Sequence, residues 1–339
     1  MANVTIIGAG AFGTALAIYN HRQGHQVCVW AFEKDLPESV RAEGENKQYL
    51  ADVKVPAGVA WTNDMGEACK GADLVMIVVP SAHVRMTARA LKDHLPSDAP
   101  IVSTAKGVET ETLALMSDVL RQELPHHRSD LCYMSGPSFA REVAMGRPAD
   151  VALAGADNAK ARQAQEILHS ASFRVYTSVD IIGVELGGAL KNVVAVACGA
   201  SDGLNMGASA RASLMTRGLA EITRMGVTMG ANPLTFLGLA GVGDLILTCT
   251  GDLSRNRTLG MRIAKGEKAS DIVAGQAAVA EGYASAPAVN ALAEKMDVDM
   301  PISRAVYRVL YEDANLVTEA AHLMSRESKD ELMGILDVK

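Results

Sequence analysis

The stretch from Asn3 to Glu33 constrains the fold of this chain more than any other. It reads NVTIIGAGAFGTALAIYNHRQGHQVCVWAFE, which is an apolar β-branched run, three glycines, a helical run and a second apolar run. This order predicts a strand, a tight turn, a helix and a parallel strand. Turn geometry alone would account for the glycines, but the second strand favours a dinucleotide-binding unit.

The three glycines have separate expected tasks. Gly8 permits the tight turn, Gly10 lets a pyrophosphate approach the backbone, and Gly13 allows close contact between helix and strand. Free N–H groups at the start of the helix would then bind the phosphates.

Two residues just past the second apolar run bear on the choice between NAD and NADP. Glu33 follows the run at the position where a carboxylate accepts hydrogen bonds from ribose hydroxyls, which favours NAD. The alternative is a solvated loop acid. Phe32 is expected either against the adenine ring or in the protein core.

Short apolar runs in the first half alternate with helical stretches. They predict an α/β Rossmann-like domain whose mostly parallel sheet is covered by helices on both faces. The expected strands are 4–7, 26–30, 73–79, 100–105, 131–135 and 150–155, with 173–178 as a further candidate. The expected helices are 12–23, 83–94, 110–123 and 158–170.

The second half has a different character, because strand signals fade and helical patterns continue. We therefore expect a dinucleotide-binding domain over 1–180 and an all-α substrate and catalytic domain over 181–339. The expected helices are 181–200, 209–229, 258–265, 287–296, 302–311 and 317–324, with Pro287 in a first turn.

Composition disfavours several classes of function. A net charge of -7 without a long basic run argues against nucleic-acid binding. Five scattered cysteines without a Cys-x-x-Cys pair, and a start without a signal-peptide pattern, favour a cytoplasmic protein. The apolar window 181–200 could span a membrane, but its charged residues favour a buried helix and no membrane insertion. The histidines lack metal-ligand spacing, so no metal is expected.

The segment LGGALKNVVAVACGA places Lys191 in an otherwise apolar helical stretch. Apolar surroundings lower a lysine pKa, which suits general acid–base chemistry. The alternative is a lysine that reaches solvent past a buried stem. Gly187 and Gly188 each weaken a helix by about 1 kcal/mol relative to alanine. We expect them to clear space for a substrate or cofactor.

Further polar groups stand at strand ends and in one cationic loop. Lys106 and the pair Gly136 and Ser138 follow expected strands, where ligands bind in open α/β sheets. A surface loop would also explain Lys106, and helix capping would also explain Ser138.

Asp244 lies within an apolar run, and we expect it either to cap a short helix or to hold an ammonium such as that of Lys191. The SRNR segment, with Ser254, Arg255 and Asn256, matches the oxygens of a phosphate. A solvated cationic loop is the alternative.

Together these segments resemble NAD(P)-dependent glycerol-3-phosphate dehydrogenase of the bacterial type. The resemblance rests on GAGAFGTALA, VVPS, AKGVE, SGPSFAREV, GVELGGALKNVVAVACGASDGL, TRGLAEITRMG, GLAGVGDLILTCTGDLSRNR and VAEGY, which are spread over nearly the full length. It implies a cytoplasmic oxidoreductase that interconverts sn-glycerol 3-phosphate and dihydroxyacetone phosphate with NAD or NADP. The enzyme would supply glycerol 3-phosphate for phospholipid synthesis and form a homodimer.

The resemblance also implies residue roles, with Lys191 as proton acceptor and donor. The expected catalytic residues are Lys191, Lys106, which adds positive charge near the reacting oxygen, and Asp244, which orients Lys191. The implied substrate-binding residues are Lys106, Gly136, Ser138, Lys191, Asp244, Ser254, Arg255 and Asn256. The resemblance implies as cofactor-binding residues Gly8, Gly10, Ala11, Phe12, Gly13, Phe32, Lys106, Ala140, Arg255, Val279 and Glu281. Glu33 is also expected to bind the cofactor, from its position after the second apolar run.

Many bacterial members carry serine and an aromatic residue at 11 and 12, and a basic residue at 32. Loss of the basic residue agrees with a preference for NAD. Two alternatives stay open. One is a related β-hydroxyacid or 6-phosphogluconate-type dehydrogenase, and the other is a dinucleotide sensor without catalysis.

Overall fold

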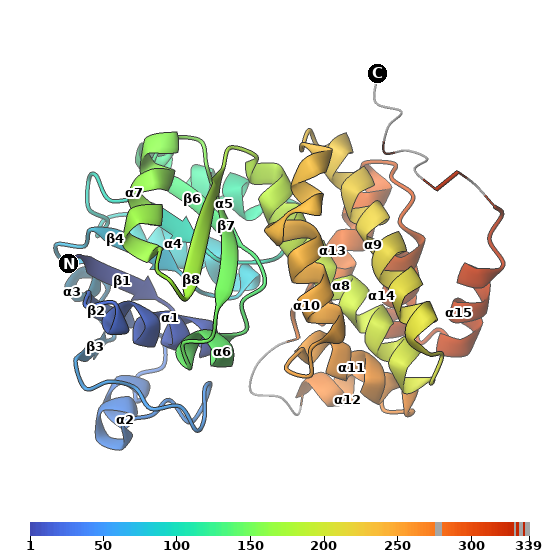
Figure 1. Ribbon diagram of the computed structural model, residues 1–339, viewed down its shortest axis with the longest axis horizontal. Coiled ribbons are helices and arrows are strands. Elements are labelled where there is room, and N and C mark those ends of the chain that lie inside the picture. The colour runs from blue at the N-terminus through green and yellow to red at the C-terminus, as the bar shows by residue number, and fades with distance from the viewer. Residues whose placement is uncertain (275–279, 329, 332–334, 336–339) are drawn as a thin grey trace. The chain divides into compact units, whose positions relative to one another are not determined.

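The chain divides into two compact units in the computed structural model, which describes residues 1–274, 280–328, 330, 331 and 335 (Figure 1). The first unit comprises Met1–Ala105 and Met116–Ile181, and the second comprises Lys106–Leu115 and the chain from Ile182 onward. Each unit has its own hydrophobic core.

The first unit is built on one sheet, which has eight strands in the described part of the chain, in the order β3-β2-β1-β4-β5-β6-β7-β8. The strands are β1 (Asn3–Ile7), β2 (Gln26–Trp30), β3 (Val59–Thr62), β4 (Leu74–Ile77), β5 (Ile101–Ser103), β6 (Leu131–Ser135), β7 (Ala149–Gly155) and β8 (Phe173–Ser178). β6 and β7 are antiparallel, and the other neighbours are parallel. Every residue of β4 and β6 is buried, which explains their continuous apolar sequences.

Helices connect these strands. They are α1 (Ala11–Arg22), α2 (Leu36–Glu43), α3 (Met65–Cys69), α4 (Val84–Leu91), α5 (Met116–Glu123), α6 (Ala140–Ala144) and α7 (Asn158–Leu168). Tyr19 links α1 to β8 and α7. Its ring centroid lies 5.0 Å from that of Phe173 in β8, and its hydroxyl donates to Leu168 O in α7 at 2.6 Å. The mostly parallel α/β fold expected for this half is confirmed.

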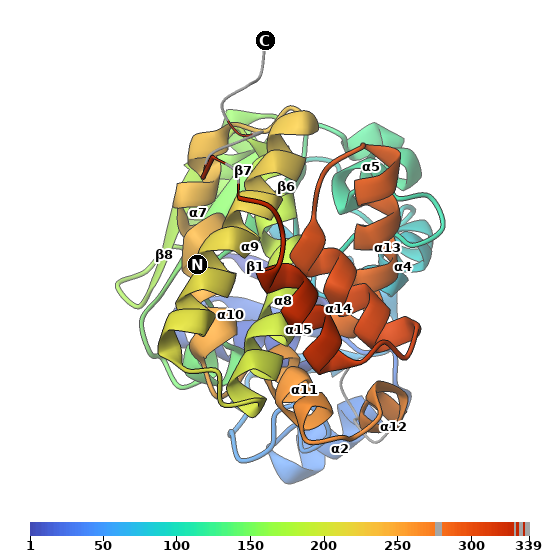
Figure 2. The same cartoon turned by 90° about the vertical axis from the view of Figure 1, so that its right-hand side faces the viewer.

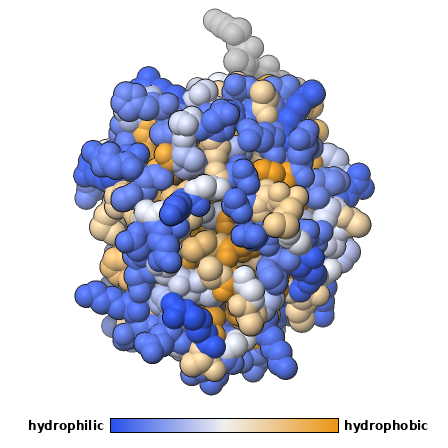
Figure 3. Space-filling model, turned by 90° about the vertical axis from the view of Figure 1, so that its left-hand side faces the viewer, coloured by the Kyte–Doolittle hydropathy of each residue, from blue (hydrophilic) through white to orange (hydrophobic). Residues whose placement is uncertain are grey.

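Figure 3 shows one face of the molecule, mostly hydrophilic with a small apolar strip near its middle.

Two local expectations differ from the structure. The short strand β3 was not expected, since its four residues do not establish a period. The helix expected over 110–123 is helical only from Met116, because Val108 and Leu115 form an antiparallel bridge. Both side chains lie in the core of the second unit, and burying this apolar pair outweighs the local helical pattern.

The second unit is helical, as expected. Its helices are α8 (Ile181–Gly203), α9 (Ala208–Thr228), α10 (Asp244–Thr250), α11 (Arg255–Ala264), α12 (Ala269–Ala274), α13 (Glu281–Lys295), α14 (Pro301–Tyr311) and α15 (Leu316–Met324). A π-helical turn, Leu239–Gly243, precedes α10. By length and composition α8 could cross a membrane, but 89% of its apolar window is buried inside the protein (Figure 2). It is the core helix of this unit.

Pro287 does not open a helix as expected but lies inside α13. A proline has no N–H, so the carbonyl four residues earlier loses its helical donor. That carbonyl belongs to Tyr283, and the hydroxyl of Tyr311 donates to it at 2.8 Å. A side chain of α14 thus replaces the missing backbone bond, which allows α13 to continue through the proline.

Candidate active site

The glycine loop after β1 has the geometry of a phosphate-binding turn. Gly8 has φ +122, and a Cβ there would lie 2.3 Å from Val78 O. A Cβ at Gly13 would lie 1.9 Å from Gly8 O, so this glycine allows helix and strand to touch. A Cβ at Gly10 would meet nothing within 4 Å, which leaves open space beside the backbone. The loop therefore fits a pyrophosphate at Gly10.

The start of α1 presents backbone donors to that space. Gly10 is its N-cap residue and offers no side-chain acceptor, so the first N–H groups of the helix, at Ala11 and Phe12, are not capped by a side chain. An anionic phosphate would satisfy these groups and interact favourably with the helix dipole.

The residues after β2 provide a carboxylate and an exposed aromatic ring. Phe32 is 70% exposed and meets only the edge of Trp30 among the ring contacts of the described residues, so its alternative expectation as a core residue is wrong. The hydroxyl of Tyr49 donates to Glu33 Oε1 at 2.5 Å. Burial and Glu33 raise the pKa of Tyr49 to about 12. Glu33 is therefore an oriented carboxylate rather than a freely solvated one.

The loop after β6 is shaped by a glycine. Gly136 has φ +151, and a Cβ there would lie 2.8 Å from Val151 Cα, so the position excludes other residues. The alternative expectation, that Ser138 caps α6, is wrong, because Phe139 is the N-cap residue and no side chain caps the helix. Its hydroxyl donates instead to Gly136 O at 3.1 Å. Ala140 is the first residue of α6.

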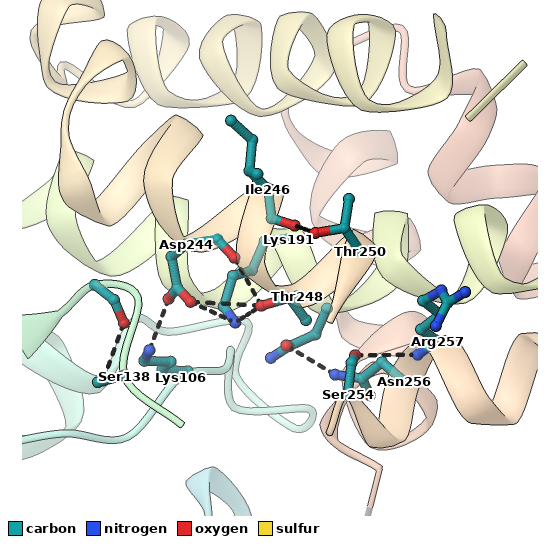
Figure 4. Close-up of polar contacts among 12 residues, drawn as sticks. Lys106, Ser138, Lys191, Asp244, Ile246, Thr248, Thr250, Ser254, Asn256 and Arg257 are labelled. Carbon is teal, nitrogen blue, oxygen red and sulfur yellow. Dashed lines mark hydrogen bonds and ion pairs between the residues drawn. The ribbon is translucent and has the colours of Figure 1, made fainter. Parts of the chain in front are cut away.

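Two lysines converge on one carboxylate in the second unit (Figure 4). Asp244 Oδ1 lies 2.9 Å from Lys191 Nζ, and Asp244 Oδ2 lies 2.7 Å from Lys106 Nζ. Lys191 Nζ also donates to Thr248 Oγ1 at 2.5 Å. Asp244 does not cap its own helix, because the N-cap of α10 is Gly243 without a side-chain bond. Its carboxylate serves the two ammonium groups instead.

Burial and charge set the proton affinities of this cluster. Burial lowers the pKa of Lys191 to about 8, although Asp244 acts in the opposite direction. Burial acts to raise the pKa of Asp244, but Lys106 and Lys191 outweigh it and the net pKa is lowered. Asp244 is therefore ionised at neutral pH, while Lys191 can gain and lose a proton there. Lys191 is buried to 5% exposure and does not reach solvent past its stem.

An amide pair extends the cluster from α8 to α11 and α13. Asn256 Nδ2 donates to Asn192 Oδ1 at 2.9 Å, and Asn256 Oδ1 accepts from the backbone N–H of Gly282 at 2.8 Å. These bonds fix the orientation of the Asn256 amide. Asn192 directly follows Lys191 and therefore belongs to the same cluster. Its bond to Asn256 fixes the direction of its own side-chain N–H groups.

The remaining residues of the SRNR segment have different tasks. Ser254 caps α11, because its hydroxyl accepts from Arg257 N at 3.2 Å. Arg257 forms ion pairs with Asp202 at 2.8 Å and Asp252 at 3.0 Å, so it is structural. Arg255 is exposed at the first position of α11.

Two expected cofactor residues lie at or before the start of α13. Arg255 reaches solvent, but the protein around its guanidinium removes part of its hydration and lowers its pKa, while the charge of Glu281 acts to raise it. Arg255 and Glu281 therefore interact electrostatically. Glu281 is the first residue of α13. Val279 lies outside the described residues.

Gly187, one of the two glycines before Lys191, has a packing explanation instead of the expected one. A Cβ at Gly187 would lie 2.3 Å from Ala240 O, so Gly187 makes room for the π-helical turn before α10 and not for a substrate. This close approach brings Asp244 beside Lys191. Similarly, a Cβ at Gly199 would lie 1.9 Å from Arg257 O. The absence of a side chain at Gly199 therefore lets the start of α11 pack directly against α8.

Sequence reasoning placed most of this cluster but missed three residues. Thr248 follows Asp244 by one helical turn, and its spacing on α10 was the available signal. Asn192 directly follows Lys191, and this adjacency was the available signal. Tyr49 gave no signal, because it lies far from Glu33 in the sequence. No group of metal-ligating side chains occurs among the described residues.

A glycine loop that fits a pyrophosphate in one unit, and a buried lysine of lowered pKa paired with a carboxylate in the other, are typical of an NAD(P)-linked dehydrogenase. Family models agree with this class. Residues 3–161 match the NAD-dependent glycerol-3-phosphate dehydrogenase N-terminus, and residues 180–320 match the C-terminus of the same family. The chain belongs to the NAD-dependent glycerol-3-phosphate dehydrogenase family.

Individual relatives cover nearly the whole chain. The glycerol-3-phosphate dehydrogenase [NAD(P)+] of Syntrophotalea carbinolica is 47% identical over 331 residues, which are 97% of this chain and 99% of the relative. The crystal structure of glycerol-3-phosphate dehydrogenase from Coxiella burnetii has a TM-score of 0.90 at 36% identity, covering 96% of this chain and 99% of the other. The enzyme from Saccharomyces cerevisiae has a TM-score of 0.79 at 27% identity, covering 94% and 98%.

Proposed function

We propose that this chain interconverts sn-glycerol 3-phosphate and dihydroxyacetone phosphate with NAD or NADP. The observation that carries the proposal is the buried arrangement in which Asp244 bridges Lys106 and Lys191. A secondary alcohol must lose a proton when it is oxidised to a ketone, and Lys191 has the pKa for that task. Family membership supports the same chemistry.

We assign separate roles to the two domains. The domain over 1–180 binds the dinucleotide through Gly8, Gly10 and Gly13 and the start of α1. The domain over 181–339 binds the substrate and supplies the acid–base group. Lys106 acts with this second domain, because the segment Lys106–Leu115 packs with it.

Lys191 moves the proton in this proposal. A lysine ammonium has three donors, and Asp244 and Thr248 accept two of them. The third is available to the substrate oxygen. In the oxidation the neutral amine takes the hydroxyl proton, and in the reduction the ammonium returns it. The nicotinamide, when bound, accepts or supplies the hydride.

The neighbouring charges assist this proton transfer. Asp244 orients Lys191 and stabilises its charged form, while Lys106 adds positive charge near the oxygen that becomes negative. Preorganised charges of this kind contribute several kcal/mol to many reactions, about 3 kcal/mol for one donor.

We assign the substrate phosphate to the start of α11. Arg255 supplies a guanidinium there, and Asn256 retains one N–H beyond its bond to Asn192. Ser254 contributes by capping α11, which fixes the start of that helix. Gly136 and Ser138 are proposed substrate contacts of the first domain. The further proposed cofactor contacts are Ala11, Phe12, Phe32, Ala140, Arg255, Val279 and Glu281.

We further propose that NAD is preferred. Tyr49 holds the Glu33 carboxylate, which would accept hydrogen bonds from ribose hydroxyls and repel a 2′-phosphate. The exposed ring of Phe32 would cover the adenine. We also propose that the enzyme is a cytoplasmic homodimer that supplies glycerol 3-phosphate for phospholipid synthesis. The five free cysteines agree with a reducing compartment.

One assay tests the proposed activity. Purified protein is mixed with NADH and dihydroxyacetone phosphate, and the absorbance of NADH is followed. We expect oxidation of NADH that depends on the ketone, and slower turnover with dihydroxyacetone, which lacks the phosphate. Tight NADH binding without turnover would support the sensor, and turnover of a β-hydroxyacid or of 6-phosphogluconate instead would support the related dehydrogenases.

A further inference from the structure

A buried asparagine of the first unit, Asn46, connects two parts of the proposed cofactor site that lie far apart in the sequence. It is 0% exposed and belongs to the segment that joins α2 to β3, at the β3 edge of the sheet (Figure 1). This segment forms a closed loop over residues 44–55, because Glu45 and Lys54 near its ends form an antiparallel bridge. Asn46 therefore has a fixed place within a compact loop.

The side-chain amide of Asn46 makes three hydrogen bonds. Its Nδ2 donates to Ala9 O at 2.9 Å and to Thr14 Oγ1 at 2.8 Å, and its Oδ1 accepts from Tyr49 N at 3.2 Å. A backbone carbonyl can only accept and a backbone N–H can only donate, so these partners fix which end of the amide faces which. A buried position that needs two donors and one acceptor in this arrangement suits an amide, and neither a carboxylate nor an apolar side chain can replace it.

The donor end of the amide controls the turn where a pyrophosphate fits. Ala9 lies within that turn, and its carbonyl points at Asn46 in the protein interior. The peptide bond between Ala9 and Gly10 is trans. In a trans peptide the carbonyl and the next N–H point in opposite directions, so the N–H of Gly10 is directed away from Asn46. If this peptide rotated, it would present a carbonyl, which cannot donate a hydrogen bond to a phosphate.

The acceptor end of the amide controls the residue that holds Glu33. Asn46 Oδ1 binds the N–H of Tyr49, and the backbone carbonyl of Asn46 accepts from Leu50 N at 2.8 Å. These bonds fix the backbone from which the Tyr49 side chain extends. The hydroxyl of that side chain donates to Glu33 Oε1 at 2.5 Å. A short chain of hydrogen bonds thus runs from the phosphate turn through Asn46 and Tyr49 to the carboxylate.

We propose that Asn46 is a positioning residue that couples the phosphate turn to the ribose carboxylate. Through Ala9 it directs the N–H of Gly10 toward the pyrophosphate, which NAD and NADP share. Through Tyr49 it holds Glu33, which distinguishes the two cofactors at the ribose. Because Asn46 is fully buried, it acts only through these neighbours. The proposal rests on the proposed use of NAD or NADP by this chain.

The first test is Asn46→Ala in the full chain, with the Kd of NADH and of NADPH measured by fluorescence titration. Loss of the bond to Ala9 weakens both cofactors, and loss of the bond to Tyr49 weakens NADH further. We expect the Kd to rise by about tenfold for NADH and by about threefold for NADPH. The preference for NADH should therefore fall by about threefold.

Asn20→Ala is the matched control for lost stability. Asn20 is also 0% exposed, and its Nδ2 donates to Leu16 O at 2.8 Å within α1. Thermal unfolding should show that both variants are destabilised, but Asn20→Ala should leave both Kd values unchanged. If Asn46→Ala and Asn20→Ala bind the two cofactors alike, Asn46 is merely structural and the proposal is wrong.

A double variant tests the path through Tyr49. Tyr49→Phe already lacks the hydroxyl that holds Glu33. Adding Asn46→Ala to Tyr49→Phe should therefore raise the Kd of NADH and of NADPH by the same factor, without a further change in their ratio. A ratio that falls as much in this background as in the unmodified protein would show that Asn46 does not act through Tyr49, and the proposed coupling would fail.

Thr14→Val tests the phosphate end alone and replaces the first test if Asn46→Ala does not fold. The Thr14 hydroxyl donates to Ala9 O at 3.3 Å and accepts from Asn46, and valine keeps its shape. We expect the Kd of both cofactors to rise by about threefold with no change in their ratio, because Asn46 Oδ1 still binds Tyr49. Unchanged Kd values would overturn the proposal.

The same titrations separate this proposal from the proposed activity. Tight binding of NADH by the unmodified protein without turnover of dihydroxyacetone phosphate would contradict the activity alone, and the Kd values of the variants would still decide the role of Asn46. Binding of neither NADH nor NADPH would overturn both.

Discussion

The glycine loop of the first unit and the lysine cluster of the second are two different kinds of binding site. The loop is a continuous stretch of chain, and it acts through backbone N–H groups that the absence of side chains exposes. The cluster is made of side chains from separate segments, and it acts through charges held in a buried environment. A backbone site tolerates changes that leave the turn intact, whereas a charge cluster fails when one member is lost.

The strongest test of this comparison is removal of the acid–base group itself. Lys191→Met keeps an apolar stem in the buried position but has no proton to exchange. We expect kcat to fall by about 10²–10⁴-fold, the range for loss of a general acid–base residue. NADH binding, measured by fluorescence titration, should be unchanged because the loop is untouched. Lys265→Met is the matched control on an exposed residue, and near-native turnover by Lys191→Met would refute the assignment.

Asp244→Asn tests whether the carboxylate matters through charge. The amide keeps the shape but leaves two ammonium groups without their shared counter-ion. We expect kcat to fall by about 10²-fold or less, and stability by about 3 kcal/mol, since a buried charge is left unpaired. The pKa of Lys191 should fall further, because Asp244 acts to raise it. A pH profile unchanged from that of the unmodified protein would contradict this role.

The pH dependence of the unmodified enzyme should differ between the two directions. Oxidation needs neutral Lys191, so its kcat should rise with pH and level off above about 8. Reduction needs the ammonium, so its kcat should be highest below about 8 and fall above it. The change approaches tenfold per pH unit on the inactive side. Profiles that rise together in both directions would exclude a single titrating lysine.

The sequence predicts these two regions to different degrees, for physical reasons. Gly8, Gly10 and Gly13 could be assigned individually, because local turn geometry fixes their roles. The partners of Lys191 could not, because Asp244 and Thr248 reach it only after the π-helical turn packs against Gly187. Gly187 was consequently misread as space for a ligand. The expectation of a helix over 110–115 was wrong for a similar reason. Val108 and Leu115 are buried in the core of the second unit, and this burial overrides the local helical periodicity.

Two glycines of the loop after β1, Gly10 and Gly13, allow a comparison of cofactor binding with stability. Gly10→Ala should leave stability nearly unchanged, since a Cβ there meets nothing in the protein. It should raise the KM for NADH by about tenfold, because the methyl group lies where a pyrophosphate would approach. Gly13→Ala should instead destabilise the fold by about 1–3 kcal/mol, because its Cβ would overlap Gly8 O. Thermal unfolding and cofactor KM, measured on both variants, separate these effects. Equal effects on stability would refute the distinct roles.

The smallest expected effect concerns the choice of cofactor. Tyr49→Phe removes the hydroxyl that holds the Glu33 carboxylate but keeps the ring, so the fold should be nearly unaffected. A carboxylate that is free to turn away repels a 2′-phosphate less, and the preference for NADH over NADPH should weaken by about threefold, or 0.7 kcal/mol. Glu33→Gln should weaken it more, because the charge itself is gone. The ratio of kcat/KM for the two cofactors measures both effects. If Glu33→Gln leaves that ratio unchanged, recognition of the ribose depends on other groups and the proposed preference for NAD loses its physical basis.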